Sequence, residues 1–135
     1  MGSVAYRSKN KTSTLKDYVS WFEIPAVNFN QAVLFYNAIY DIKMEVFAKG
    51  EYNMALFPSN GGISGAVVAG PSSVPSETGP LLYMNGGDDL NVVLSRIPAA
   101  GGRIIMNKTL INAESGYFAV FIDSEGNKLA LHSQN

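Results

Sequence analysis

An internal repeat constrains this 135-residue chain more than any other feature. The segment VNFNQAVLFYNAIY carries apolar residues at helical spacing, at Phe29, Ala32, Val33 and Tyr36. The segment DDLNVVLSRIPAAGG repeats the same stripe 61 positions later, at Leu90, Val93, Leu94 and Ile97. A chain that contains one amphipathic helix twice is expected to contain the surrounding structural unit twice.

Each expected helix carries start and stop signals. Asn28 with Gln31 three residues later predicts an N-cap and a capping box. Asp89 takes the N-cap position of the second helix, which explains the GGDD segment better than a metal-binding acid pair does. Pro98 is expected to break or kink this second helix, and Gly101 and Gly102 to end it.

Strand-like segments surround both helices. WFEIPA and GPLLYMNG precede them, and the 61-residue offset pairs Trp21 with Leu82 and Glu23 with Met84. IKMEVFA and RIIMNKT follow the helices. NMALFPSNGGISGAVVAG and YFAVFIDSEGNKLALHS then repeat at an offset of 64, each as strand, glycine turn and strand. The glycines at 61–65 are interpreted as a hairpin turn and not as a phosphate loop, because no helix follows them.

The predicted fold class is therefore α+β, with two β-α-β-β-β modules that form a curved mixed sheet around a cleft. We expect one domain over residues 18–133, with module one at 18–69 and module two at 79–133. The linker, residues 70–78, is rich in Pro, Gly and Ser. A cleft between such modules predicts a small organic molecule as the partner.

Charge and hydropathy exclude several other partners. Residues 1–17 are expected to be a flexible extension, which contains four of the ten basic residues and no acid before Asp17. The remaining chain is acidic and offers no basic groove for nucleic acid. No apolar segment approaches the roughly 20 residues that span a bilayer, and no signal peptide is evident, so we expect a cytoplasmic protein without a membrane partner. The absence of cysteine excludes disulfides and thiolate sites.

The order of these segments resembles the vicinal oxygen chelate superfamily, which includes glyoxalase I, bleomycin-resistance proteins and extradiol dioxygenases. The resemblance rests on the paired modules, the AVLFY helix, the linker, and an Asp-x-x-Gly-Asn segment at 123–127 before the last apolar strand. WFEIP, GYFAVFIDSEGN and the terminal LHS are most similar to glyoxalase-related proteins of unassigned function. Open sheet edges and a helix-free face, together with this resemblance, predict a homodimer.

The resemblance also implies positions for metal ligands, on the first and last strands of each module. These positions are Trp21, Ala66, Leu82 and Ala130, and none of these side chains binds a divalent cation. Such a site needs roughly three or more converging nitrogen or oxygen donors, and the chain contains one histidine. We therefore expect no metal and no other cofactor.

Glu23 and His132 are the predicted catalytic residues. Strand alternation places Glu23 on the face of Trp21, and His132 on the face of Ala130. In the cavity implied by the resemblance, the two would form a general acid–base pair. The alternatives are a purely structural pair, or a His132 that reaches solvent at the chain terminus.

Four further side chains are predicted to bind the ligand in an apolar pocket: Trp21, Leu56, Met84 and Phe118. Core packing is the alternative for each of them, because aromatic residues and methionines commonly fill cores. Trp21 occupies a ligand position of the family, which favours a role as a pocket wall that stacks on a flat molecule.

Three functions are compatible with these residues. The first is a metal-independent isomerase- or lyase-like enzyme that uses Glu23 and His132. The second is a non-catalytic protein that sequesters its ligand, as resistance proteins of the family do. The third is a degenerate module that serves in assembly. A fold supports all three, because function resides in the site.

Overall fold

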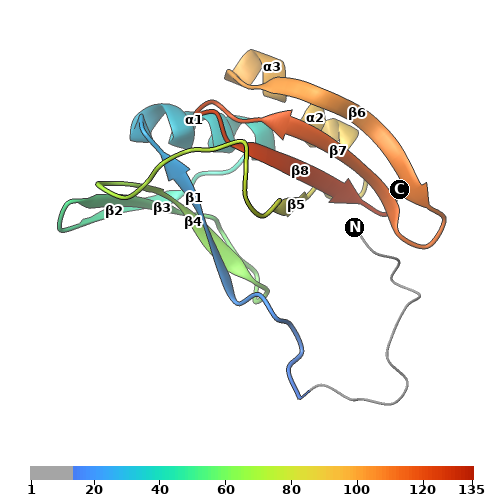
Figure 1. The fold of residues 1–135 in the computed structure, drawn as a ribbon, viewed down its shortest axis with the longest axis horizontal. Helices are drawn as coiled ribbons and strands as arrows, with labels where there is room; N and C mark the ends of the chain where they lie inside the picture. The colour runs from blue at the N-terminus through green and yellow to red at the C-terminus, as the bar shows by residue number, and fades with distance from the viewer. Residues whose placement is uncertain (1–13) are drawn as a thin grey trace.

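The computed structural model describes residues 14–135 and contains the predicted element order twice (Figure 1). Module one consists of β1 (Trp21–Ala26), α1 (Phe29–Tyr40), β2 (Glu45–Lys49), β3 (Tyr52–Leu56) and β4 (Ser64–Ala69). Module two consists of β5 (Tyr83–Asn85), α2 (Asn91–Leu94), α3 (Ile97–Ala100), β6 (Arg103–Asn112), β7 (Gly116–Ile122) and β8 (Lys128–Ser133). The α+β prediction is confirmed.

Each module folds into a four-stranded mixed sheet. The strand orders are β1-β4-β3-β2 and β5-β8-β7-β6, and in both sheets the first strand pairs in parallel with the last. The remaining pairs are antiparallel. Met54 lies opposite Val68 in one sheet, and Phe118 lies opposite His132 in the other. This equivalence confirms the offset of 64 for the last two strands.

The first strands of the two modules repeat at a different offset from the one predicted. Glu23 lies beside Ala66, and the residue in the same place beside Ala130 is Tyr83, which is 60 positions after Glu23. The predicted match of Glu23 with Met84 is therefore wrong by one residue. Because the helices repeat at 61, one extra residue lies between β5 and α2. A shift of one residue moves a side chain to the other face of a strand.

The start of α1 depends on both modules. Asn28 is the N-cap, and its side chain accepts a hydrogen bond from Gln31 N at 3.1 Å, as predicted. The reciprocal half of the capping box is absent, because Asn28 N donates to Glu125 Oε1 at 2.6 Å. Glu125 also accepts from Val27 N. A carboxylate from the second module thus satisfies amides at the beginning of the first module's helix.

The second helix is divided into two short pieces, as Pro98 predicts. α2 ends at Leu94, and α3 begins at Ile97 with Pro98 in its first turn. Gly101 adopts a left-handed conformation with φ of 110° and ends α3. The assigned N-cap of α2 is Leu90 and not Asp89, but the Asp89 side chain accepts from Asn91 N at 2.9 Å. The Asp89 side chain therefore caps the first turn of α2, although Asp89 lies one residue before the assigned N-cap.

One hydrophobic core joins the modules. Its buried residues come from both sheets, from α1 and from the α2–α3 segment. Phe35 of α1 stacks on Phe121 of β7, with ring centroids 6.3 Å apart. Side chains on alternate strand positions point into this core, and the other positions form what we call the open face of each sheet. Trp21 and Glu23 lie on the open face of module one, and Ala130 and His132 on that of module two.

The Asp-x-x-Gly-Asn segment is a second connection between the modules. Asp123 Oδ1 accepts from the amides of Glu125 and Asn127, which shapes the turn before β8. Asp123 Oδ2 accepts from the hydroxyl of Tyr36 at 2.6 Å. Asn127 Nδ2 donates to Pro25 O of β1 at 2.7 Å. The motif that contributed to the family resemblance therefore holds the modules together.

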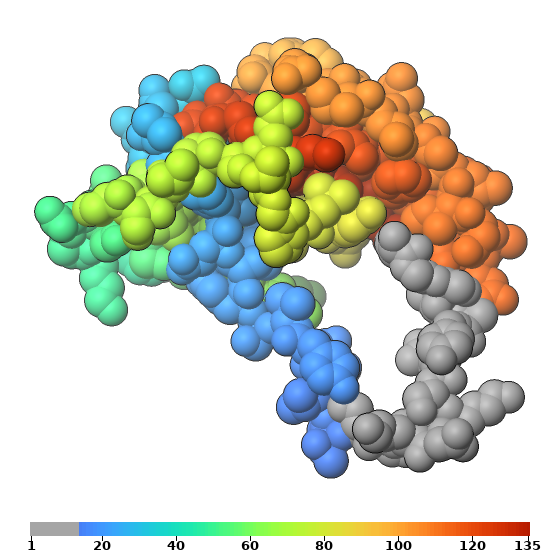
Figure 2. Space-filling view, viewed as in Figure 1, coloured from blue at the N-terminus to red at the C-terminus, as the bar shows by residue number. Residues whose placement is uncertain are grey.

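The linker crosses between the two modules in the space-filling view (Figure 2). It is tied to module two, because Ser76 N donates to Asn127 Oδ1 and Lys128 N donates to Ser76 O. Most of the predicted N-terminal extension, residues 1–13, lies outside the described residues, and residues 14–17 belong to no helix or strand. Over the part of the chain that the structure describes, no helix is long and apolar enough to cross a membrane.

Candidate functional site

The predicted pair of Glu23 and His132 does not form a hydrogen bond within the chain. Glu23 is exposed on β1, and its Oε2 accepts from Trp21 Nε1 at 3.3 Å. His132 is half-buried on β8, and its Nε2 lies 2.6 Å from Ser115 O. The side chains lie on the open faces of two different sheets. Catalytic roles for Glu23 and His132 stay predictions.

The contact with Ser115 fixes the orientation of the imidazole. A backbone oxygen only accepts hydrogen bonds, so Nε2 of His132 must carry the proton. In the neutral ring, Nδ1 then holds the lone pair. Among residues 14–135, Nδ1 has no hydrogen-bond partner. Within the described part of the chain, His132 therefore has one ring nitrogen on the open face of module two that can accept a hydrogen bond.

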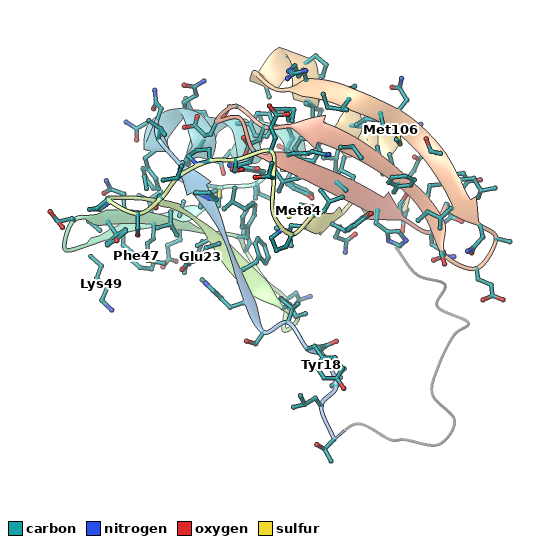
Figure 3. The ribbon with its side chains drawn as sticks, in the orientation of Figure 1. Tyr18, Glu23, Phe47, Lys49, Met84 and Met106 are labelled. Atoms are coloured by element: carbon teal, nitrogen blue, oxygen red, sulfur yellow. The ribbon has the colours of Figure 1, made fainter. Side chains whose placement is uncertain are left out.

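The four predicted ligand-binding residues lie on three different surfaces of the described chain, and their roles stay predictions. Trp21 and the half-buried Leu56 lie on the open face of module one. Phe118 lies on the open face of module two, where its ring is 6.3 Å from the ring of Tyr83. Met84 faces the core and is 7% exposed. Figure 3 shows Glu23 on β1 and Met84 near the centre of the molecule.

A pocket of about 790 Å³ lies between the modules. One wall comes from β1 and from the segment between β3 and β4, and the other comes from residues 81–85 of module two. Most of its lining is apolar and includes Phe22, Tyr40, Phe57, Ile63, Leu81 and Met84. Ligand pockets usually enclose roughly 300–1,000 Å³ and have this character. The pocket is therefore large enough for a small organic molecule.

Tyr40 holds one edge of this pocket in place. It lies at the end of α1, and its hydroxyl donates to Asn85 O of β5 at 2.7 Å. Burial raises the pKa of Tyr40 well above its ordinary value of 10.0, so the hydroxyl stays protonated and remains a donor. This bond fixes the distance between the helix of module one and the first strand of module two.

Glu23 lines a different and smaller pocket of about 200 Å³. Its other walls come from the linker and from residues 127–129. Leu82 contributes to both pockets and separates them. His132 is not among the residues that line either of these two pockets.

The residues at the positions that the resemblance assigns to metal ligands do not fit a metal. The strand register replaces Leu82 with Leu81 as the equivalent of Trp21, and neither leucine offers a donor atom. Ala66 and Ala130 are fully buried on their sheets and are equally inert. In residues 14–135, no three His, Asp or Glu side chains lie close enough together to hold a cation.

Sequence reasoning predicted a cleft between the modules and Met84 as a ligand-binding residue, but it did not identify the aromatic residues that line this pocket. Phe22, Tyr40 and Phe57 belong to regular elements or their ends, and alternation assigns them to the core. Residues 81–85 of module two lie across the pocket from these aromatic residues. The space between the two sides depends on how one module is placed against the other. The hydrophobic periodicity of each module does not predict the space between the modules.

By sequence, the chain matches no protein-family model and no curated protein. Comparison of structures gives clear similarities. A glyoxalase/bleomycin resistance protein/dioxygenase domain from a Frankia species superimposes with a TM-score of 0.69 at 17% identity, covering 88% of this chain and 98% of the other. A glyoxalase-related enzyme from Fulvimarina pelagi gives a TM-score of 0.63 at 14% identity, covering 88% of each chain.

The chain has the vicinal oxygen chelate fold. A glyoxalase I variant from Zea mays shares this fold with a TM-score of 0.62 at 14% identity, and the match covers 84% of this chain and 45% of the maize protein. The resemblance seen in the sequence is confirmed at the level of the vicinal oxygen chelate fold. Identities this low carry no activity from one protein to another.

Proposed function

We propose that this protein binds a small organic molecule in the pocket between its modules. The observation that carries the proposal is the size and lining of that pocket, about 790 Å³ with aromatic and aliphatic walls. Several structures with the same fold are described as glyoxalase-related or bleomycin resistance proteins, which supports a small-molecule ligand.

Sequestration without chemistry is the function that this geometry supports best. Asp17 is the one charged side chain among the residues of 14–135 that line the pocket. The hydroxyl of Tyr40 already donates its hydrogen bond to Asn85 O. General acid–base chemistry most often uses a histidine, a lysine or a pair of carboxylates, and the ionisable side chains that residues 14–135 bring to this lining are Asp17, Tyr40 and Tyr83.

A metal-independent isomerase- or lyase-like activity is the second candidate, and the geometry of His132 favours it. The side chain of His132 lies on the open face of module two, and its Nδ1, which has no hydrogen-bond partner among residues 14–135, can accept a proton from a ligand bound there. Glu23 would act in the same reaction only if both open faces met around one ligand. A second copy of the chain offers a way to bring them together.

We also propose that the protein is a homodimer. Both faces of β2 are exposed, and Val46 and Phe47 are 52% and 40% exposed. Trp21, on the open face of the same sheet, is 42% exposed. Apolar side chains gathered on one sheet are commonly covered by a partner. Figure 3 shows Phe47 and Glu23 on this sheet.

A matched pair of variants tests the pocket. Ile63 is 46% exposed at its rim, so Ile63→Trp should fill the entrance without disturbing the core. N-phenyl-1-naphthylamine, a neutral aromatic dye that fluoresces in apolar surroundings, is the probe. Ile63→Trp should weaken dye binding at least tenfold, whereas Leu110→Trp, at an exposed position of β6, should leave it unchanged. Equal binding by both variants would exclude the pocket as the ligand site.

A further inference from the structure

The rings in the pocket between the modules are arranged around Phe57. Phe22 lies 5.6 Å from it at an interplanar angle of 42°, and Tyr40 lies 6.5 Å away at 86°. Centroid separations of 4.5–7 Å are those of attractive aromatic pairs. The three rings line the pocket at different angles to one another, so a flat aromatic guest can add to the cluster by stacking or by an edge-to-face contact.

Gly65 makes room for this arrangement. A Cβ atom at Gly65 would lie 2.5 Å from the ring of Phe22, which is closer than real Cβ contacts allow. The missing side chain lets the Phe22 ring lie directly against β4, where Gly65 is its strand partner. The pocket therefore has a broad aromatic wall where any other residue would push the ring away.

The charge on the pocket lining is negative. Asp17 is the only ionised side chain that the described residues contribute to it, and no lysine or arginine from residues 14–135 joins it. Asp17 is exposed beside the pocket, so its carboxylate repels an anionic guest through solvent, and this repulsion is strongest at low ionic strength. Aromatic faces attract cations and so act in the same direction.

We propose that the ligand is a flat aromatic molecule without a negative charge. This inference rests on the proposed binding function and specifies its ligand class. The rings supply the attraction for an aromatic surface, and Asp17 discriminates against anions. A neutral or amine-bearing aromatic compound fits both features, whereas an aromatic carboxylate, sulfonate or phosphate conflicts with the second.

Two dyes that differ by one charged group test the class. N-phenyl-1-naphthylamine is neutral, and 8-anilinonaphthalene-1-sulfonate adds a sulfonate to the same ring system. We expect the full-length protein to bind the neutral dye at least tenfold more tightly in low-salt buffer. Asp17→Asn should reduce this preference roughly fivefold, mainly by improving sulfonate binding. Asp88→Asn, at an exposed position that does not line the pocket, should leave it unchanged.

The possible outcomes separate the two proposals. If Ile63→Trp affects neither dye, the pocket is not the binding site and the proposed function fails. If Ile63→Trp weakens the neutral dye but the sulfonate binds equally well, the pocket stands and the ligand class is wrong. A preference that persists unchanged in Asp17→Asn would also overturn the class, because the discrimination would not come from Asp17. Circular dichroism of each variant confirms that the fold is retained.

Discussion

The hydroxyl of Tyr36 donates a hydrogen bond of 2.6 Å to Asp123, and so connects the helix of one module to a turn of the other. Both side chains are buried. Burial, and secondly the negative charge of Asp123, raise the pKa of Tyr36 well above 10.0, so the phenol remains a donor at all physiological pH values. The relative placement of the modules, and with it the pocket, depends on this pair.

Tyr36→Phe should therefore destabilise the protein. A hydrogen bond to a charged group contributes about 1.5–3 kcal/mol, and the remaining donors to Asp123 limit the loss to that range. Urea unfolding followed by circular dichroism measures the change. Tyr52→Phe is the matched control, because its exposed hydroxyl contacts only Ser72 and should contribute about 0.5 kcal/mol or less. Equal losses in both variants would contradict a special role for the buried pair.

Asp89 should make stability depend on pH in the acid range. The amide of Asn91, and then Lys108, lower the pKa of Asp89 from its ordinary value of 3.8. A lowered pKa in the folded state gives stability that is present above 3.8 and is lost as the pH falls through the folded value. Unfolding of the wild type and Asp89→Asn at pH 6 and pH 3 should show a difference that shrinks at the lower pH. A difference that is constant between these pH values would refute this assignment.

The purified protein should contain no stoichiometric zinc, nickel, iron or magnesium. The positions that the resemblance assigns to metal ligands are occupied by Trp21, Ala66, Leu81 and Ala130, which offer no suitable side-chain donors. Elemental analysis after dialysis gives the metal content. Recovery of one tightly held equivalent, with a lower melting temperature after chelation, would show that a site exists elsewhere in the chain.

The homodimer should depend on the exposed apolar residues of β2. Multi-angle light scattering at micromolar concentrations should give twice the chain mass of 14.5 kDa. Phe47→Glu places a charge on the open face of β2, the edge strand of the first sheet, and should raise the dissociation constant at least tenfold. Val92→Glu, at an exposed position on α2, should have no effect. A monomeric wild type would rule the proposal out.

The imidazole of His132 should be protonated on Nε2 when it is neutral. Long-range proton–nitrogen correlation spectra distinguish the two ring nitrogens, and the single histidine makes the assignment unambiguous. The Glu23→Gln variant tests whether Glu23 of one protomer lies close to the imidazole of His132 in its partner. Altered imidazole signals in dimeric Glu23→Gln, and unaltered ones at monomeric dilution, would place the two side chains together. If the signals are the same in both states, the acid–base pair must be abandoned.

The elements were predictable from the sequence because their signals are local. The stripe from Phe29 to Tyr36, the Asn28 cap and the break before Pro98 each depend on residues within a few positions of one another. The offset of β5 was not predictable, because the extra residue before α2 leaves the helix stripe unchanged and appears only in the register of Tyr83 with Ala130.

The candidate site was harder to predict than the fold. Alternation correctly assigned Glu23 and His132 to sheet faces, but the distance between the faces depends on the packing of one module against the other. The contact of Glu125 with Asn28 spans 97 residues and leaves no trace in local sequence. The pocket arises in the same way, from a gap between segments that are distant in the chain.

The interrupted helix of module two has a consequence for the order of folding. α1 runs for 12 residues, whereas α2 and α3 have four each, and Phe35 and Tyr36 complete the core over the second sheet. During synthesis the first half leaves the ribosome with its own long helix, while the second half has little helical surface of its own on which to condense. The nascent second sheet must therefore assemble on a first half that is already present. The first copy of the repeat is expected to fold before the second.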